Sequence, residues 1–121
     1  MSLTQEQCET ILEKKEIMPE EVQSLLEARD AGVVDFVLMD IREPYEYDDA
    51  HIKGCDVLVP TTQFLRKLDV VDSYKEKKVV MYCRTANRTG QVLNYLLSKG
   101  GYDNYAHMVY GIVSYPGELV R

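Results

Sequence analysis

The chain has 121 residues, a formal net charge of −6 and three cysteines. This length suits a single domain with its own core, and the acidic charge argues against nucleic acid or an anionic membrane surface as a partner. We find no stretch with the length and apolarity of a membrane span and no signal peptide, so the default expectation is a cytoplasmic protein with no membrane partner.

Two helices and a short strand are expected at the start of the chain. Thr4 and Gln7 form a capping-box pattern, which predicts a helix over residues 5–14. Residues 16–18 are a candidate strand, and Pro19 stands at the preferred first position of a second helix. The order helix, strand, helix indicates a mixed α/β chain.

The middle of the chain alternates between apolar runs and turn signals. Residues 35–40 predict a central buried strand, because they are apolar almost throughout. Pro44 begins a short helical turn, residues 51–54 are expected to form a loop, and residues 56–59 form a further strand that ends at a proline. The next helix is expected to start at Thr61 or Thr62 and to bury Phe64, Leu65 and Leu68.

The stretch from residue 79 to residue 90 is the centre of the sequence. The apolar run 79–82 predicts a short buried strand, and Cys83 stands at its carboxyl end. A polar loop with two arginines follows, and then a helical pattern. This helix is expected to carry Val92, Tyr95, Leu96 and Lys99 on one face, with Leu93 and Leu97 beside them. A last strand over residues 106–109 and a helical turn over residues 111–115 complete the pattern.

This alternation predicts an α/β fold with a small, mainly parallel five-stranded sheet flanked by helices on both faces. The carboxyl ends of parallel strands share one edge, where such folds bind their ligands. Asp40, Arg42 and Cys83 are therefore expected to lie at the same edge of the sheet.

Cys83 is the candidate nucleophile. A thiol attacks as the thiolate, and a helix start together with Arg84 and Arg88 favours that negative charge. The backbone N–H groups of the loop would also surround an anionic group on the sulfur. Most free cysteines are small buried side chains, but the strand end, the helix start and the arginines favour a reactive one. The cysteines are odd in number and widely spaced, which predicts neither a disulfide framework nor a zinc site, and we expect no metal and no cofactor.

Three pieces of the sequence resemble one family. Residues 83–89 read Cys-Arg-Thr-Ala-Asn-Arg-Thr, close to a Cys-Arg-Ser/Thr-Gly-Asn-Arg-Ser loop. The second piece, residues 40–47 (Asp-Ile-Arg-Glu-Pro-Tyr-Glu-Tyr) followed by residues 50–55 (Ala-His-Ile-Lys-Gly-Cys), is similar to Asp-Val-Arg-Glu-Pro-x-Glu-Tyr and Gly-His-Ile-Pro-Gly-Ala. The third piece, residues 100–112, resembles the family's ending. In this order and spacing, from about residue 18 to residue 115, the chain resembles the rhodanese-like sulfurtransferases.

The resemblance implies a rhodanese-like three-layer fold over residues 16–121, with residues 1–15 as an appended N-terminal helix that includes any cloning leader. It also implies a sulfurtransferase that carries sulfane sulfur as a Cys83 persulfide, from thiosulfate or a similar small anionic donor to cyanide or a thiol, with a protein acceptor also open. The substrate-binding loop would consist of Arg84, Thr85, Ala86, Asn87 and Arg88. Asp40 and Arg42 are expected to form an ion pair that holds the edge of the sheet together.

Several residues depart from the family pattern. Ala86 stands where glycine is usual, and a positive φ at this position would strain an alanine by about 1 kcal/mol. Tyr110 replaces the first glycine of a common pair, and Tyr115 replaces a common tryptophan. These departures concern the shape of the loop and the choice of substrate, not the nucleophile.

Two other function classes stay open. One is a persulfide carrier or partner-binding module, which releases sulfur only to a specific protein. The other is a phosphatase or arsenate reductase of a related branch, whose loop has five residues between cysteine and arginine, whereas four residues separate Cys83 from Arg88 here. His51, Cys55 and His107 are more readily interpreted as structural residues than as a catalytic base or a resolving thiol.

Overall fold

The structure of the protein is a computed structural model that describes residues 2–121. Its α-helices are α1 (Gln5–Leu12), α2 (Pro19–Asp30), α3 (Pro44–Asp49), α4 (Leu68–Asp72) and α5 (Asn87–Lys99), with 3₁₀ helices η1 (Thr61–Lys67) and η2 (Ile112–Ser114). Its strands are β1 (Glu16–Ile17), β2 (Val37–Asp40), β3 (His51–Ile52), β4 (Val57–Leu58), β5 (Val79–Tyr82), β6 (Tyr105–Met108) and β7 (Leu119–Val120).

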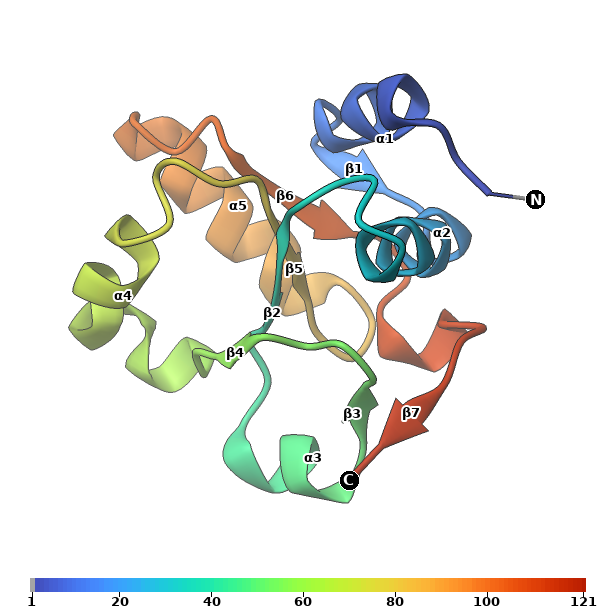
Figure 1. Cartoon of the computed structure of the whole chain (residues 1–121). Helices are drawn as coiled ribbons and strands as arrows, with labels where there is room; N and C mark the ends of the chain where they lie inside the picture. The colour runs from blue at the N-terminus through green and yellow to red at the C-terminus, as the bar shows by residue number, and fades with distance from the viewer. Residues whose placement is uncertain (1) are drawn as a thin grey trace.

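The main sheet has five strands in the order β1-β6-β5-β2-β4, and every neighbouring pair is parallel (Figure 1). The predicted α/β fold with a five-stranded sheet is therefore confirmed. Asp40, the last residue of β2, lies opposite Tyr82, the last residue of β5. The residues that follow these two strands consequently start from the same edge of the sheet.

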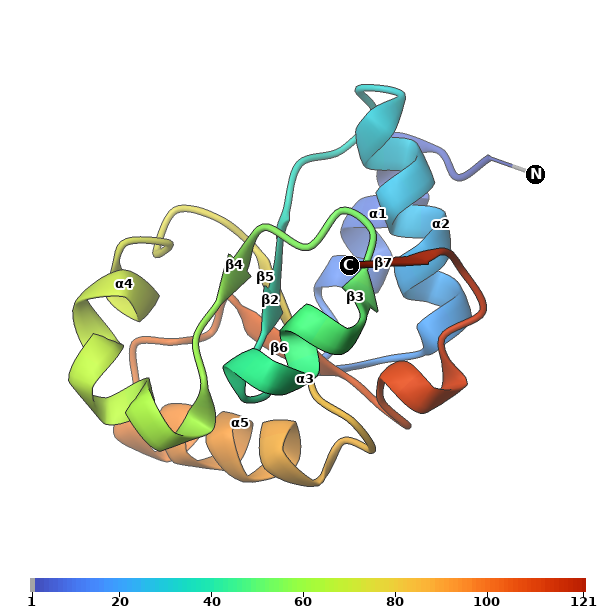
Figure 2. The same ribbon diagram turned by 90° about the horizontal axis from the view of Figure 1, so that it is seen from below.

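Helices cover both faces of this sheet, with α1 and α2 on one side and α4 and α5 on the other (Figure 2). Successive residues of β5 alternate between the two sides, as a strand requires. Val80 and Tyr82 belong to the core on the α1 and α2 side, whereas Met81 and Cys83 belong to the core on the α4 and α5 side. The side chain of Cys83 thus faces the start of α5.

The first helix begins as predicted. The Thr4 hydroxyl accepts the backbone N–H of Gln7, and the Gln7 side chain accepts the backbone N–H of Thr4. Cys8 and Leu12 of α1 are buried in the same core as α2. The helix thus packs into this core through Cys8 and Leu12, with Ile11 against its border, and Cys8 has the core-facing position that the sequence indicates.

Three local expectations were wrong. Residues 51–54 were expected to form only a loop, but His51–Ile52 is a strand that pairs antiparallel with Leu119–Val120. The helix expected from Thr61 is a 3₁₀ helix followed by a short α-helix, and its tighter winding leaves Leu65 exposed while Phe64 is buried.

The buried face of α5 also differs from the expected one. Its buried residues are Thr89, Leu93 and Leu96, whereas Tyr95 and Leu97 are 41% and 38% exposed. The helix therefore packs through a stripe that begins at a polar residue, Thr89, which an apolar pattern cannot indicate. Among the helices of residues 2–121, none is long and apolar enough to cross a membrane.

Candidate active site

Cys83 follows β5 directly and is the first residue of the four-residue loop, residues 83–86, that leads into α5. Its side chain is buried, with 1% of the residue exposed. The backbone N–H of Ala86 donates a hydrogen bond to the Cys83 sulfur at 3.2 Å. A donor at this distance stabilises negative charge on the sulfur. It therefore favours the thiolate, which is the nucleophilic form of a cysteine.

Ala86 gives the turn its shape. It is the N-cap residue of α5 and has φ 82° and ψ −2°, in the left-handed region. The positive φ considered from the sequence is therefore present, and an alanine there costs about 1 kcal/mol relative to an unstrained residue. In this conformation the Ala86 N–H turns back to the sulfur, so the strain accompanies the contact that the site uses.

Thr89 and His107 extend the site beneath the cysteine. The Thr89 hydroxyl lies 3.7 Å from the Cys83 sulfur and 2.8 Å from Nδ1 of His107. Both side chains are buried. Sequence reasoning assigned no separate role to Thr89 and a structural one to His107, because no local pattern indicates that β6 places residue 107 beside the start of α5.

Arg88 is paired with a carboxylate of α3. Its guanidinium donates to both carboxylate oxygens of Glu46, at 2.7 and 3.0 Å, and so ties the start of α5 to α3. The hydrogen bond from Arg88 lowers the pKa of Glu46 from its usual 4.5 to about 2. The same pair raises the pKa of Arg88, to which the Cys83 sulfur makes a smaller contribution. Arg88 thus braces the loop, and its expected contact with substrate stays a prediction.

The other loop residues are more exposed to solvent than Arg88. Arg84, Thr85 and Asn87 are exposed. Arg84 lines a pocket of about 510 Å³ at the edge of the sheet, together with Arg42, Tyr45, Glu46, Asp49, Ala50, Ile112, Val113 and Leu119. The pocket joins the cysteine loop, the Asp40 loop and α3, so three of the regions singled out in the sequence meet around it.

Asp40 and Arg42 form the ion pair expected from the sequence. Asp40 is fully buried and accepts both the Arg42 backbone N–H at 2.8 Å and its guanidinium at 2.8 Å. The guanidinium also donates to the carbonyl oxygen of Ala50 and lies over the ring of Tyr82. The pair holds the turn after β2 beside the last residue of β5, because both charges are enclosed and each is satisfied by the other.

Gly111 fixes the cysteine loop from its other side. A Cβ on this residue would lie 2.1 Å from the carbonyl oxygen of Arg84, and φ is 74°. The N–H groups of Ile112 and Val113 donate to the carbonyl oxygens of Cys83 and Arg84, at 2.9 and 3.3 Å. The turn after β6 therefore presses its backbone onto the loop, which only glycine permits.

The remaining candidates lie apart from this arrangement. His51 stacks on Tyr47 and pairs Nδ1 with the Tyr47 carbonyl oxygen at 3.0 Å. Cys55 packs on the α1 and α2 side of the sheet, whereas Cys83 faces α5. Burial raises the pKa of Cys55 to about 11. These surroundings favour structural roles for both residues.

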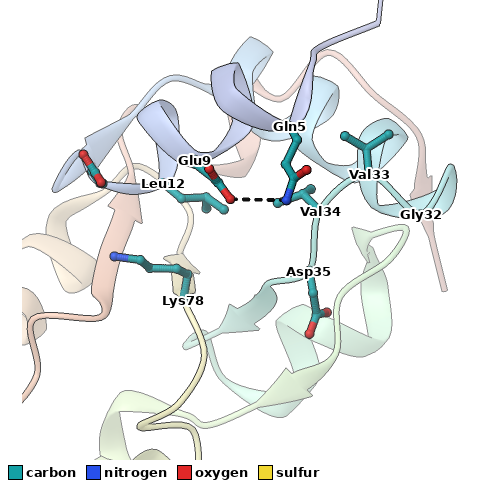
Figure 3. Close-up of a pocket in the computed structure, with 9 residues that line it drawn as sticks. Gln5, Glu9, Leu12, Gly32, Val33, Val34, Asp35 and Lys78 are labelled. Carbon is teal, nitrogen blue, oxygen red and sulfur yellow. Dashed lines mark hydrogen bonds between the residues drawn. The ribbon is translucent and has the colours of Figure 1, made fainter.

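A larger pocket, of about 680 Å³, lies elsewhere, between α1 and the residues that precede β2 and β5 (Figure 3). Figure 3 shows Gln5 and Glu9 of α1 hydrogen-bonded to each other above Lys78 and Asp35. Its lining includes neither a cysteine nor a histidine. Within residues 2–121, no group of three or more His, Cys, Asp or Glu side chains is arranged to hold a metal ion.

Known proteins share both sequence and fold with this chain. A family model of the rhodanese-like domain matches residues 18–117. The tRNA uridine(34) hydroxylases of Hamiltonella defensa and Pectobacterium atrosepticum are 35% and 33% identical to the chain over 85 residues, which make up 67% of this chain and 23% of each of those proteins.

Solved structures superpose on most of the chain. A rhodanese-related protein from Thermoplasma volcanium aligns with a TM-score of 0.70 and 22% identity, over 88% of this chain and 98% of that one. Thiosulfate sulfurtransferase from Pseudomonas aeruginosa aligns with a TM-score of 0.73 and 23% identity, over 97% of this chain and 22% of that one. At these identities the likeness shows the fold.

A parallel sheet whose central strand leads through a cysteine loop into a helix is the architecture of an α/β domain with its site at the carboxyl edge. The chain belongs to the rhodanese-like domain family. It spans about a quarter of the length of the curated relatives that it matches. Helix α1 lies ahead of the matched range and packs onto it.

Proposed function

We propose that the protein is a sulfurtransferase in which Cys83 carries sulfur as a persulfide. The Cys83 thiolate attacks the outer sulfur of thiosulfate or a similar anionic donor, a sulfur–sulfur bond forms, and sulfite leaves with the electron pair of the broken bond. Cyanide or a thiolate then attacks the outer sulfur of the persulfide, and the Cys83 thiolate leaves. The two steps balance without an external oxidant or reductant.

The observation that carries this proposal is the Ala86 N–H donating to the Cys83 sulfur at 3.2 Å, directly before α5. A negative charge that forms on the sulfur meets a backbone donor and a helix amino terminus. Arg84, exposed at the pocket beside the loop, supplies a positive charge for an anionic donor. The family membership supports the same chemistry.

A mass spectrum of the intact protein after thiosulfate treatment tests the proposal. We expect the mass to rise by one sulfur atom, peptide mapping to place that atom on Cys83, and cyanide to remove it as thiocyanate. Cys83→Ser should abolish both steps, whereas Cys55→Ser is the matched control and should load sulfur normally. A folded Cys83→Ser protein that still turned over thiosulfate would overturn the proposal.

A persulfide carrier is the second candidate, favoured by the apolar rim of the pocket. Tyr45, Val113 and Leu119 line it, and their exposed fractions are 74%, 60% and 44%. An exposed apolar rim is typical of a surface that meets a macromolecule. A carrier would load sulfur from thiosulfate and release it to a protein acceptor but not to cyanide.

Two other functions receive less support. The phosphatase alternative needs a longer loop than the four residues between Cys83 and Arg88, and Arg88 is occupied by Glu46. The relatives' activity on a tRNA uridine belongs to proteins of which this chain matches 23%. The net charge of −6 gives no support to an RNA-binding surface.

A further inference from the structure

The buried Cys83 thiol has few routes by which to lose its proton. Within the described part of the chain, its sulfur has two hydrogen-bond partners, the Ala86 N–H at 3.2 Å and the Thr89 hydroxyl at 3.7 Å. The amide is a donor only, whereas the hydroxyl both accepts and donates. A proton that leaves the sulfur inside the protein therefore passes to Thr89.

The Thr89 hydroxyl is in turn hydrogen-bonded to the imidazole of His107. Thr89 is 0% exposed, and its oxygen lies 2.8 Å from His107 Nδ1 and 3.2 Å from the carbonyl oxygen of Ala86. Of these two groups, only the imidazole binds a proton near neutral pH. His107 lies opposite Met81 in the pairing of β6 with β5, so its ring is on the same face of the sheet as Cys83.

The far side of the ring faces a carboxylate. Nε2 of His107 lies 3.9 Å from Glu16 on the neighbouring strand β1, and the Glu16 side chain is 73% exposed. A carboxylate on this side favours the tautomer with the proton on Nε2, which leaves Nδ1 to accept the Thr89 hydroxyl. A proton would then pass along these groups from the Cys83 sulfur to the Thr89 hydroxyl and on to His107 Nδ1.

Few charges surround His107. Glu16 faces it from β1, and the start of α5 lies against it at Thr89 and Gly90. The ammonium of Lys15, at the same edge strand, is directed to the carbonyl oxygens of Asp103 and Tyr105. Burial lowers the pKa of His107, which favours the neutral form of the ring at neutral pH.

We propose that Thr89 and His107 form a proton relay for Cys83, with Glu16 orienting the imidazole. The thiol proton moves to the Thr89 oxygen as the Thr89 proton moves to His107 Nδ1, which leaves a thiolate, an intact hydroxyl and an imidazolium beside Glu16. One proton is transferred and no other bond changes. Thr89 and His107 act on the reaction through the sulfur, so they are positioning residues, and their use in catalysis rests on the proposed sulfur transfer.

Alkylation of Cys83 by iodoacetamide, followed between pH 5 and pH 9 with peptide mapping, tests the relay without any sulfur donor. His107→Asn keeps a hydrogen-bonding group at the position of Nδ1 but binds no proton, and it should slow the alkylation at pH 7 by about tenfold or more. Thr89→Val should do the same, whereas Thr89→Ser keeps the hydroxyl and should restore most of the rate. The slope of the rate against pH should also change in His107→Asn, which a merely structural role would not cause.

Two substitutions at exposed positions test the relay without disturbing the fold. Glu16→Gln removes the carboxylate at a solvent-facing position, so it should fold and show a smaller decrease of a few-fold. Glu20→Gln, with the same change of charge on the exposed start of α2, is the matched control and should alkylate as the wild type does. Wild-type rates at every pH in folded His107→Asn and Glu16→Gln would overturn the relay.

The tautomer gives an independent readout. The chain has only two histidines, so the ring nitrogens of His107 can be assigned by NMR against a His51→Gln variant. We expect Nε2 protonated and Nδ1 unprotonated at pH 7, and a proton on Nδ1 would overturn the direction of the relay.

The two proposals fail separately. A pH profile that depends on His107 in a protein that takes up no sulfur from thiosulfate would leave the relay standing and overturn the sulfur transfer. Normal sulfur loading with alkylation independent of His107 and Glu16 would overturn the relay and leave the sulfur transfer standing.

Discussion

The turn that carries Cys55 and the loop that carries Cys83 place the same side chain in opposite surroundings. Cys55 is partly exposed, and its thiol meets the carbonyl oxygens of Leu38 and Val57 at 3.6 and 3.5 Å. Cys83 is 1% exposed, and its sulfur meets the N–H of Ala86. Carbonyl oxygens favour the protonated thiol, whereas an N–H donor favours the thiolate. The two thiols therefore differ in the polarity of the backbone groups around the sulfur, in addition to the burial that raises the pKa of Cys55.

The largest expected effect is a difference in reactivity between these two thiols. Burial raises the pKa of Cys55 to about 11, so about one molecule in 10⁴ carries its thiolate at pH 7. Iodoacetamide should therefore modify Cys83 at least 100-fold faster than Cys55 at pH 7, as read by peptide mapping. Equal rates would contradict the comparison, and Cys83→Ser shows how much signal comes from the other thiols.

The second prediction concerns the backbone contact that holds the Cys83 loop in place. Gly111→Ala would put a Cβ 2.1 Å from the Arg84 carbonyl oxygen at a φ of 74°. We expect a loss of about 3 kcal/mol or more in the free energy of unfolding, measured with urea, together with reduced sulfur loading on Cys83. The Cys55 turn should stay unreactive.

Gly32→Ala is the matched control for this substitution. Gly32 has a φ of 77°, close to that of Gly111, but a Cβ there meets nothing within 4 Å. It should cost only the backbone strain, about 1 kcal/mol, without affecting sulfur loading. A similar loss in both variants would show that the contact with Arg84 contributes nothing beyond the backbone conformation.

Much of this arrangement follows from the sequence, and the rest depends on pairing between distant residues. The run 79–82 and the prolines and glycines around the helices are local signals, and they locate the strands of the main sheet. The strand at His51–Ile52 has two residues and pairs with Leu119–Val120, so no local pattern indicates it.

The site divides in the same way. The Ala86 conformation follows from its place before a helix, where a glycine is usual. The partners of Arg88 and Thr89 do not follow from the local sequence. Glu46 lies 42 residues from Arg88, and His107 lies 18 residues from Thr89, so each pair meets only through the packing of α3 and β6 around α5.

The third prediction concerns the loss of the Arg88–Glu46 ion pair, and of the stability it contributes, at acid pH. Because Arg88 lowers the pKa of Glu46 to about 2 in the folded protein, the pair stabilises the fold above the unfolded-state pKa of about 4.5. This contribution, about 2–3 kcal/mol, should be lost as the pH falls from about 4.5 toward 2. The difference in unfolding free energy between wild type and Glu46→Gln should accordingly shrink over this range in urea titrations.

An exposed ion pair serves as the control for the acid titration. Lys53 and Glu118 are 3.4 Å apart, and both side chains are 65% exposed. Glu118→Gln should therefore change stability little at any pH, because solvent screens the pair. An equal difference between wild type and Glu46→Gln at pH 7 and pH 2.5 would show that the partly buried Glu46 carboxylate is not held ionised by Arg88.

The smallest expected effect concerns the strain in the cysteine loop. Ala86→Gly removes the left-handed strain of alanine but adds freedom to the unfolded chain, so we expect a gain of about 0.5 kcal/mol in unfolding free energy. Sulfur loading should be retained, because the Ala86 N–H keeps its position. Thermal unfolding by calorimetry measures the gain, and a loss of stability would mean that the Ala86 methyl group makes packing contacts that outweigh its strain.

The pairing of β3 with β7 has a consequence for joining this domain to other polypeptides. Leu119 of β7 lines the pocket beside the cysteine loop, whereas Gln5 of α1 lines the pocket at the opposite edge of the sheet. A peptide tethered after Arg121 therefore starts close to the pocket that the cysteine loop lines through Arg84, where a short flexible linker gives an effective concentration on the order of 1 mM. The same peptide placed ahead of α1 has to cross the domain. Intramolecular delivery of sulfur would thus depend on which end of the chain carries the acceptor.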